Sequence, residues 1–545
     1  MKYLAIILLM TALFVFSGCQ QQIALENTVV PAETNTAGLD VKGMLRIVES
    51  SPDVVDPQCT SGYYTIALNV FDRLVEVKTN GQSSEIVPSL ARSWEISDDG
   101  LVYTFHLQPD VKFSNGEALT SSDVLYTIKR LLTHPKSVNR ALVSEIMGTE
   151  ALRNGETDKL EGFRILNDLD FEITLRNPYS AFLACLSTPG ASILDEKTTE
   201  AAGERFGYEE EVTIGTGPFL FREWKTGTHI ILTANHDCWS GEPACSGIEI
   251  QFNTDTESQR IQFIDGKLDI LDLEKLSDDA EFFIHGDIYQ ERLVQGPRVG
   301  ISYVALNESV APLDDVRVRK ALQMSLDRHM LLQVAYSGRG QLENGIFPHG
   351  LIGFNPDIEP IRYDPEAAKA LLEEAGLKDG FDLEIALVTT EGMTHRQLVT
   401  LIGSMFEKIG VRPKIEEMDE ETFISRRKQG GISCYTATWS ADYNDPDNFI
   451  GTFFGSAENS ISRSICYSDA DVIGRIDHAR AIVEQEERLA EYKALEEILV
   501  RDQAVWIPLY SRQHYFIVGE GVKGFTVSWN GWSSTSYKNV SVSRQ

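Results

Sequence analysis

Alternating and helical patterns of apolar residues divide the chain after residue 42 into mixed strands and helices. Residues 43–48 alternate as a strand does, and residues 104–107 predict another strand before a turn at residues 114–116. Thr120, with an acid three positions later at Asp123, predicts the N-terminus of a helix, because the two side chains form a capping box.

Two more helices are predicted in the C-terminal half. Asp364 and Pro365 are typical of a helix start, and Gly376 is typical of its end. Apolar residues at helical spacing from about residue 476 to residue 500 predict one long helix. Strands that alternate with helices favour α/β lobes.

The first 18 residues have the pattern of a secretory signal. Lys2 precedes an apolar run over residues 4–16, which is shorter than the roughly 20 residues needed to span a bilayer. The run ends at Ser17-Gly18-Cys19, which resembles a bacterial lipobox, although its first position is Phe16 and not leucine. We expect cleavage before Cys19 and lipid attachment to it; the alternative is an ordinary signal peptide. Residues 20–38 are polar and without a period, and we interpret residues 19–42 as a flexible tether.

Length and charge limit the classes of protein. A chain of 545 residues exceeds one hydrophobic core, so two or three lobes are expected. Its 81 acidic residues outnumber 49 basic ones, giving a net charge of −32, which disfavours nucleic acid and anionic lipid surfaces as partners. Solubility explains the scattered acids, and a weak attraction for cationic ligands stays open.

Six cysteines remain if Cys19 carries lipid. In an exported chain disulfides are allowed, and Cys238 and Cys245 flank a turn-like segment, which makes them the easiest local pair. Buried free cysteine is the alternative. No Cys-x-x-Cys occurs, so we expect no structural zinc and no other cofactor. The six are Cys59, Cys185, Cys238, Cys245, Cys434 and Cys466.

Motifs of catalysis are missing. The chain has no His-Glu-x-x-His, no Gly-x-x-x-x-Gly-Lys and no Gly-x-Ser-x-Gly. Residues 215–218 begin like a nucleotide loop, but the third glycine is absent and a tight turn is the better interpretation. The acid pairs at residues 98–99 and 314–315 stand where turns or caps are expected. We therefore predict that the chain is not an enzyme.

Short motifs over the chain after residue 42 resemble the family 5 extracellular solute-binding proteins, which include oligopeptide-, dipeptide- and nickel-binding proteins of ABC importers. Their order and spacing make the resemblance specific, although each motif is modest alone. The motifs are residues 70–75, 88–94 (Pro-Ser-Leu-Ala-Arg-Ser-Trp), 98–100, 103–107, 111–116, 120–124, 215–219, 235–239, 312–322 and 327–328. Cys238 stands where the family more often has tyrosine.

The resemblance implies an α/β, two-lobed periplasmic-binding-protein (Venus-flytrap) fold with an extra domain and a cleft between the lobes. Closure around a ligand would let an ABC permease distinguish the loaded protein, and no bond would be made or broken. The implied protein is a monomer outside the cytoplasm, held at the membrane by its N-terminal lipid. The implied boundaries are 1–18 signal, 19–42 tether, 43–76 lobe I, 77–211 extra domain II, 212–300 lobe I, 301–504 lobe III and 505–545 lobe I.

The expectation about the ligand rests on a Trp-x-x-Asp motif at residues 439–442. In peptide-binding members a similar acid contacts the α-ammonium of the ligand, so we expect this role for Asp442, with Trp439 and Ser440 beside it. The alternatives are that Trp439 belongs to the core and that Asp442 caps a turn.

The place where relatives present backbone groups to a peptide corresponds to residues 59–63. We therefore expect Ser61 and Tyr63 to contact the ligand, and Tyr64 is a further candidate; the alternative for these tyrosines is a place in the core. No partner for the ligand carboxylate can be chosen from the sequence, although Arg426, Arg427 and Lys428 are close to the motif.

Three functions stay open. The first is capture of di- to oligopeptides for import. The second keeps the fold with another cargo, such as a nickel chelate, haem or a sugar. The third is a peptide sensor without transport, or a secreted hydrolase, for which no nucleophile and base were found.

Overall fold

The computed structural model describes residues 43–80, 83–276, 280–529 and 535–544. The chain divides into residues 1–38 and residues 39–545, and all described residues belong to the second unit. The predicted signal peptide, Cys19 and the tether lie outside the described residues. In the described part of the chain, no helix combines the length and the hydropathy that a membrane span requires.

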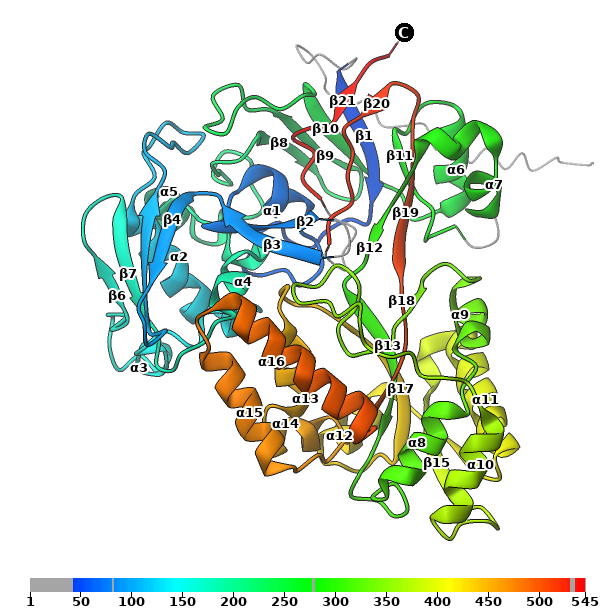
Figure 1. The fold of residues 1–545 in the computed structure, drawn as a ribbon. Helices are drawn as coiled ribbons and strands as arrows, with labels where there is room; N and C mark the ends of the chain where they lie inside the picture. The colour runs from blue at the N-terminus through cyan, green and yellow to red at the C-terminus, as the bar shows by residue number, and fades with distance from the viewer. Residues whose placement is uncertain (1–42, 81–82, 277–279, 530–534, 545) are drawn as a thin grey trace, which may run out of the picture. The chain divides into compact units, whose positions relative to one another are not determined.

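Two sheets built from distant parts of the sequence form lobe I. One has the strand order β1-β10-β9-β8 and the other β11-β19-β12 (Figure 1). β1 lies parallel to β10, and the strand predicted over residues 43–48 is confirmed. The elements of lobe I are β1 (Met44–Glu49), α1 (Thr65–Val70), β8 (Phe219–Lys225), β9 (His229–Ala234), β10 (Gly247–Phe252), α6 (Thr256–Ile264), β11 (Ile270–Asp272), α7 (Ala280–Ile284), η4 (Asp287–Arg292), β12 (Leu293–Pro297), β19 (Gln513–Val518), β20 (Val522–Lys523) and β21 (Ser541–Val542).

An antiparallel sheet of order β4-β5-β7-β6, with a β2–β3 hairpin, forms domain II. The helix predicted at Thr120 is confirmed, because the Thr120 amide and hydroxyl both donate to the Asp123 carboxylate at 2.9 Å. The elements are β2 (Val75–Asn80), β3 (Ser83–Pro88), β4 (Ala91–Ile96), β5 (Val102–Leu107), α2 (Ser121–Thr133), η1 (Arg140–Val143), α3 (Thr149–Arg153), β6 (Phe163–Ile165), β7 (Asp170–Thr174), α4 (Phe182–Leu186), η2 (Pro189–Ala191), α5 (Glu196–Ala202) and η3 (Gly203–Arg205).

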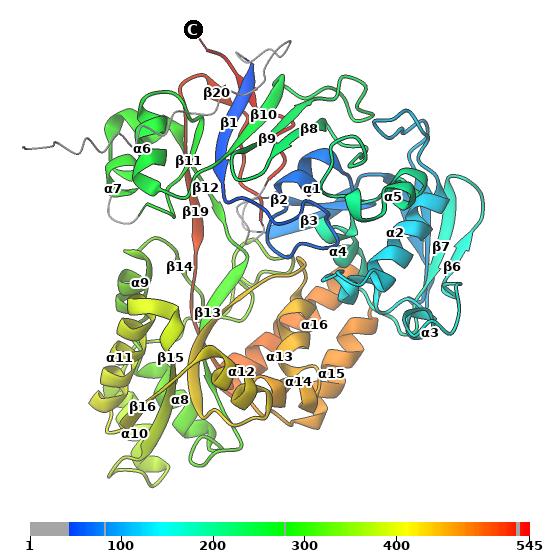
Figure 2. The same cartoon turned by 180° about the vertical axis from the view of Figure 1, so that it is seen from behind.

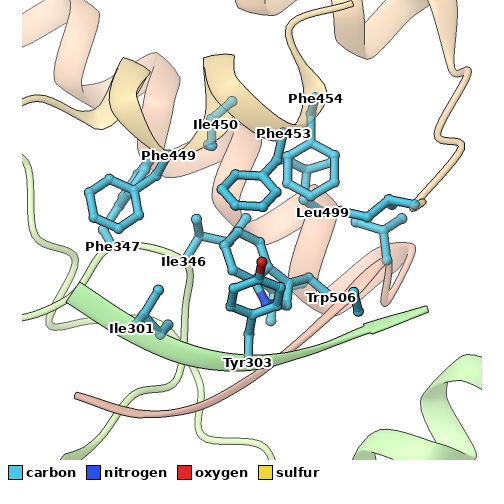
Figure 3. Packing of buried hydrophobic residues seen from close by; sticks show 14 of the residues in the cluster. Ile301, Tyr303, Ile346, Phe347, Phe449, Ile450, Phe453, Phe454, Leu499 and Trp506 are labelled. Carbon is cyan, nitrogen blue, oxygen red and sulfur yellow. The ribbon is translucent and has the colours of Figure 1, made fainter. Parts of the chain in front are cut away.

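A six-stranded sheet of order β14-β18-β13-β17-β15-β16 forms lobe III, with helices on both faces (Figures 1 and 2). On one face Tyr303 and Trp506 pack against Phe453 and the helices around it (Figure 3). α8, α9, α10 and α11 cover the other face. These layers confirm the predicted α/β class.

The elements of lobe III begin with β13 (Gly300–Leu306), α8 (Val316–Met324), α9 (Arg328–Tyr336), β14 (Gln341–Leu342), α10 (Pro365–Glu374), β15 (Asp382–Val388), η5 (Thr389–Glu391), α11 (Gly392–Lys408), β16 (Arg412–Met418) and α12 (Glu420–Lys428). They continue with β17 (Cys434–Ser440), η6 (Pro446–Asn448), α13 (Ile450–Phe454), α14 (Ala457–Ser462), α15 (Ala470–Ala481), α16 (Gln485–Glu497), η7 (Ile498–Asp502) and β18 (Trp506–Ser511). The helix predicted at Asp364 is confirmed, with the Asp364 carboxylate accepting from the Ala367 amide.

The helix predicted over residues 476–500 is wrong: the chain forms α15 and α16 with a break between them. At the break Ile482 is extended, with φ −70° and ψ 118°. The hydroxyl of Ser180 in domain II donates to the carbonyls of Arg480 at 2.6 Å and Ile482 at 2.8 Å. A partner 300 residues away thus satisfies carbonyl groups that end α15.

All six cysteines within the described residues are free. Cys238 and Cys245 are both buried, and the thiol of Cys238 lies 3.3 Å from the Ser240 hydroxyl. The structure therefore has buried free cysteines and not the local pair. Residues 215–218 form a bend against α1, where a Cβ on Gly215 would lie 2.1 Å from the Val70 carbonyl oxygen. This close approach requires a residue without a Cβ at position 215. The glycine therefore has a packing reason and does not indicate a nucleotide-binding loop.

The polypeptide passes between lobe I and lobe III at two neighbouring places, β12 to β13 and β18 to β19 (Figure 1). β18 pairs with β13, so residues 506–511 belong to the six-stranded sheet, and the implied domain boundaries stay predictions. Glu274 joins the two crossings, because its carboxylate accepts from Arg298 at 3.1 Å and Arg512 at 3.2 Å. The His514 ring lies 3.3 Å from the same carboxylate.

Substituting Glu274→Gln is expected to lower the free energy of unfolding by about 2–3 kcal/mol, since it leaves Arg298 and Arg512 without their shared carboxylate. Burial alone raises the pKa of Glu274, but His514, Arg512 and Arg298 outweigh it and lower the pKa below its usual value. A lowered pKa gives stability that is lost as pH falls through it. Urea unfolding at several pH values should therefore show a smaller acid dependence in the variant; an unchanged dependence contradicts the prediction.

Candidate functional site

A cavity of about 940 Å³ lies between domain II, the start of α1 and the α13–α15 region of lobe III. Its wall contains three tyrosines and four carboxylates, whereas Arg480 is its one cationic side chain among the described residues. The lining residues that matter below are Ser61, Tyr64, Glu145, Tyr179, Asp442, Tyr443, Asp447, Asp477 and Arg480.

Asp442 reaches this cavity from the end of β17. The Ala441 amide donates to the Val299 carbonyl at 2.9 Å, which fixes the end of the strand. Asn448 then holds Asp442 from two sides: its side-chain oxygen accepts from the Asp442 amide at 3.0 Å, and its NH₂ donates to the Asp442 carboxylate at 3.4 Å. The local fold therefore sets the direction of this carboxylate.

The Asp442 carboxylate has little compensation from the protein. Among the described residues, the one hydrogen-bond donor to this carboxylate is the Asn448 NH₂, at 3.4 Å, and the side chain stays accessible from the cavity. The surrounding walls desolvate it and raise its pKa, and the Asn448 hydrogen bond and the charge of Arg463 oppose this. A carboxylate accepts several hydrogen bonds, so a cationic donor in the cavity would be stabilised here.

Trp439 lies behind Asp442 and not in the cavity wall. Its indole donates to the Asn448 carbonyl at 3.0 Å, and its ring packs edge-on against Phe453 with centroids 5.4 Å apart. The Arg463 guanidinium stands 4.7 Å from the centroid of the Trp439 ring. Ser440 is exposed at the end of β17, opposite Gly300. The structure thus keeps Trp439 near Asp442 through Asn448, while a cation of the chain itself covers the indole.

Ser61 and Tyr63 lie on the lobe I side, just before α1. Ser61 is exposed and lines the 940 Å³ cavity and a second cavity of about 450 Å³, whereas Tyr63 lines only the second. Tyr64 lines the first cavity, and its hydroxyl donates to the Thr60 carbonyl at 3.0 Å. Burial raises the pKa of Tyr64 to about 12, with a smaller contribution from Asp442. Ser61, Tyr64 and Asp442 therefore share one cavity.

A buried network links domain II to lobe III at the cavity wall. The Asp447 carboxylate accepts from Arg480 at 2.6 Å and from the hydroxyl of Tyr179 at 3.1 Å. The hydroxyls of Tyr179 and Tyr443 lie 2.8 Å apart. Sequence reasoning missed Tyr179 and Arg480, since no short motif marks them and Tyr179 lies 268 residues from Asp447.

Asp445 caps η6 and also forms a buried ion pair. Its carboxylate accepts from the Asp447 amide at 3.0 Å, as expected of a turn acid. It also accepts from Arg488 of α16 at 2.7 Å and 3.0 Å. The two side chains are 2% and 5% exposed, so the pair is closed to solvent and holds the segment that carries Asp442.

The family model of the bacterial extracellular solute-binding proteins, family 5 (middle part), matches residues 85–460, which is more than half of the chain. The chain belongs to this family. Its members are transport binding proteins that work outside the cytoplasm and are not enzymes, which confirms the predicted family and the prediction that the chain is not an enzyme.

Relatives of the family 5 chain match over nearly its whole length. Heme-binding protein A of Haemophilus influenzae is 27% identical over 99% of this chain and 100% of the relative. The dipeptide-binding protein of Escherichia coli is 27% identical over 94% and 96%. The structure of HbpA2 from Haemophilus parasuis is 25% identical, with a TM-score of 0.79 over 92% of this chain and 99% of that one. These matches support the two-lobed fold.

A Cys–His–Asp arrangement in this family 5 chain lacks the properties of a nucleophile. The Cys59 thiol lies 3.4 Å from His134 Nδ1 and 3.3 Å from the Asp56 carboxylate. Burial and the charge of Asp56 raise the pKa of Cys59 to about 12, so the thiol stays protonated. The Asp56 carboxylate is paired with Arg130. Among the described residues, no group of three or more His, Cys, Asp or Glu side chains is arranged to hold a metal.

The basic residues of α12 do not line the cavity. Arg426 forms an ion pair with Glu416 at 2.6 Å, and the Arg427 guanidinium stands 5.9 Å from the Phe423 ring centroid. Arg463, which sequence reasoning missed, is the basic residue whose charge acts on Asp442. No motif around position 463 signals this, because Arg463, which follows α14, meets the Trp439 ring of β17 only in the folded chain.

Proposed function

We propose that this chain captures a short peptide outside the cytoplasm for an ABC importer, with the α-ammonium of the peptide on Asp442. The observation that carries the proposal is the Asp442 carboxylate, which faces a 940 Å³ cavity and accepts one long hydrogen bond within the part of the chain that the structure describes. Several relatives are named dipeptide- or di/tripeptide-binding proteins, and one solved relative, DppA from Helicobacter pylori, is a complex with the peptide STSA.

Ser61, Tyr64 and the acids around Asp442 would enclose the N-terminal part of the peptide in this proposal. Trp439 and Ser440 would act indirectly, by fixing the end of β17. The second site residue from lobe I, Tyr63, would contact a more distant part of the ligand in the 450 Å³ cavity. The ligand would thus touch both lobes, as closure requires.

Lobe closure and delivery to a permease belong to the same proposal. The two crossings between lobe I and lobe III, linked by Glu274, are where rotation would occur. We also propose that Cys19 carries the lipid and that the protein acts as a monomer. Mass measurement of the protein from membranes, before and after hydrolysis of ester-linked lipid, tests the anchor.

Haem is a second candidate, because one relative is named heme-binding protein A. Haem iron in proteins is held by His, Cys, Met or Tyr. Among the described residues that line the 940 Å³ cavity there is no His, Cys or Met, and its tyrosines Tyr64, Tyr179 and Tyr443 have raised pKa values through burial, which disfavours a tyrosinate ligand. The site therefore favours a peptide.

Mass spectrometry of the ligand that co-purifies with the protein tests the proposal directly. We expect short peptides with free N-termini, released by mild unfolding. Calorimetry with the same peptides then gives their affinity. A porphyrin, a metal chelate or a sugar in place of peptides would overturn the cargo while leaving the family assignment intact.

A further inference from the structure

The second cavity, of about 450 Å³, lies within lobe I and adjoins the first at Ser61. It is bounded by the end of β1, the residues before α1, and the ends of β11 and β19. Its volume is that of a small-ligand site and too large for a single ion. Its apolar wall includes Ile47, Ile270 and Phe516.

Carboxylates outnumber cations around this cavity. The charged side chains of its wall are Glu49, Asp53, Asp272 and Lys275, which is three carboxylates against one ammonium. Lys275 lies 3.6 Å from Asp272, but its side chain is 45% exposed, so solvent screens the pair.

Glu49 and Asp272 are the last residues of β1 and β11, and the protein fixes both side chains. The Thr65 hydroxyl donates to Glu49 at 2.6 Å, and the Glu274 amide donates to Asp272 at 3.0 Å. Burial raises the pKa of both carboxyls, more than the hydrogen bonds to them and the charge of Lys275 lower it. Among the described residues, the exposed ammonium of Lys275 is the one cation in this wall, so a cationic ligand would add compensating charge.

Tyr63 adds a neutral polar group to the same wall. Its ring lines the cavity, and its buried hydroxyl makes no hydrogen bond of ordinary length among the described residues. Burial raises the pKa of the Tyr63 phenol, and the charge of Glu49 and a longer hydrogen bond to it raise the pKa further, so the phenol stays neutral beside this carboxylate. A polar ligand in the cavity would complete the hydrogen bonding of this hydroxyl.

We propose that this second cavity is a subsite for a basic side chain of the bound peptide, a primary ammonium or a guanidinium held between Glu49 and Asp272. The inference rests on the proposed function, because Ser61 joins the subsite to the cavity that contains Asp442. A lysine fits both parts of the wall: its methylene stem packs on Ile47, Ile270 and Phe516, and its ammonium meets the carboxylates and the Tyr63 hydroxyl.

Calorimetry on the purified protein tests the subsite with tripeptides that carry lysine, or its uncharged analogue norleucine, at the second or third position. At one of these positions lysine is expected to bind about ten- to a hundredfold more tightly than norleucine, the gain of a charge-assisted hydrogen bond. Glu49→Gln and Asp272→Asn should each remove most of this preference and leave the norleucine tripeptides unchanged. Asp98→Asn, an exposed acid outside both cavities, is the matched control.

The outcomes separate the subsite from the proposed function. Equal affinities for lysine and norleucine at both positions overturn the subsite while peptide binding stands, and so does a preference that survives in both variants. If no peptide binds, the proposed function fails. The subsite is then tested by calorimetry with cadaverine, a free amine with a methylene chain like that of lysine. Cadaverine binding that is lost in Glu49→Gln supports a cation site for a free amine, and no binding overturns it. Thermal unfolding confirms that each variant is folded.

Discussion

Replacing Asp442 with alanine is expected to weaken peptide binding by about 2–5 kcal/mol, which is roughly a 30-fold to several-thousandfold rise in Kd. The reason is that a closed cavity desolvates the ligand ammonium, and Asp442 faces this cavity with one long hydrogen bond from the described residues and no ion pair among them. Asp447 cannot replace it, because Arg480 and Tyr179 occupy its oxygens. Calorimetry with one peptide on both proteins gives the difference.

The matched experiment changes the ligand. N-acetylation of the peptide removes the ammonium, so it should weaken binding to the wild type and have little further effect on Asp442→Ala. Asp477→Ala, which removes a carboxylate from the same wall that is close to Arg480, is the control and should change the affinity far less. If Asp442→Ala binds the peptide as the wild type does, Asp442 is not a ligand contact.

The pH dependence follows from the same carboxylate. Burial raises the pKa of Asp442, so this group takes up a proton at a higher pH than an exposed aspartate. A protonated Asp442 cannot pair with an ammonium, and peptide affinity should therefore fall on acidification. In Asp442→Asn the affinity should be weak at neutral pH and should lose this dependence.

The sequence predicted the parts of the fold that local contacts determine. The capping box at Thr120 and Asp123 and the cap at Asp364 involve residues three apart, and both formed as predicted. The helix over residues 476–500 failed because its break depends on Ser180, which the sequence places in another domain. Apolar spacing alone carries no signal of that contact.

The candidate site divides in the same way. A short motif pointed to Asp442, and the structure places it in a cavity wall with Ser61. Arg463, Tyr179 and Arg480 could not be predicted, because each reaches the site through contacts between elements that are distant in sequence. Glu49 and Asp272 were equally hidden, since single acids at strand ends are common and only the fold brings them to one cavity.

The second large effect is expected on stability. Asp445→Ala leaves Arg488 buried without its counter-charge and should lower the free energy of unfolding by about 3–5 kcal/mol. Burial alone lowers the pKa of Arg488, but Asp445 more than reverses this and raises it. Removing Asp445 therefore leaves the desolvation free energy of the buried Arg488 guanidinium without compensation.

Urea unfolding followed by tryptophan fluorescence measures this effect, and two further variants locate its cause. Glu417→Ala breaks the exposed pair of Glu417 with Arg396, whose side chains are 51% and 39% exposed, and should leave the unfolding midpoint nearly unchanged. Asp445→Leu combined with Arg488→Met removes both charges and should recover much of the stability lost in Asp445→Ala, because no buried charge remains. If the double variant is as unstable as Asp445→Ala, the cap of η6 and not the ion pair holds this segment. Calorimetry on the double variant then separates an effect on stability from an effect on binding. Asn448 keeps its two hydrogen bonds to Asp442 in this variant, so the folded protein should bind peptide as the wild type does.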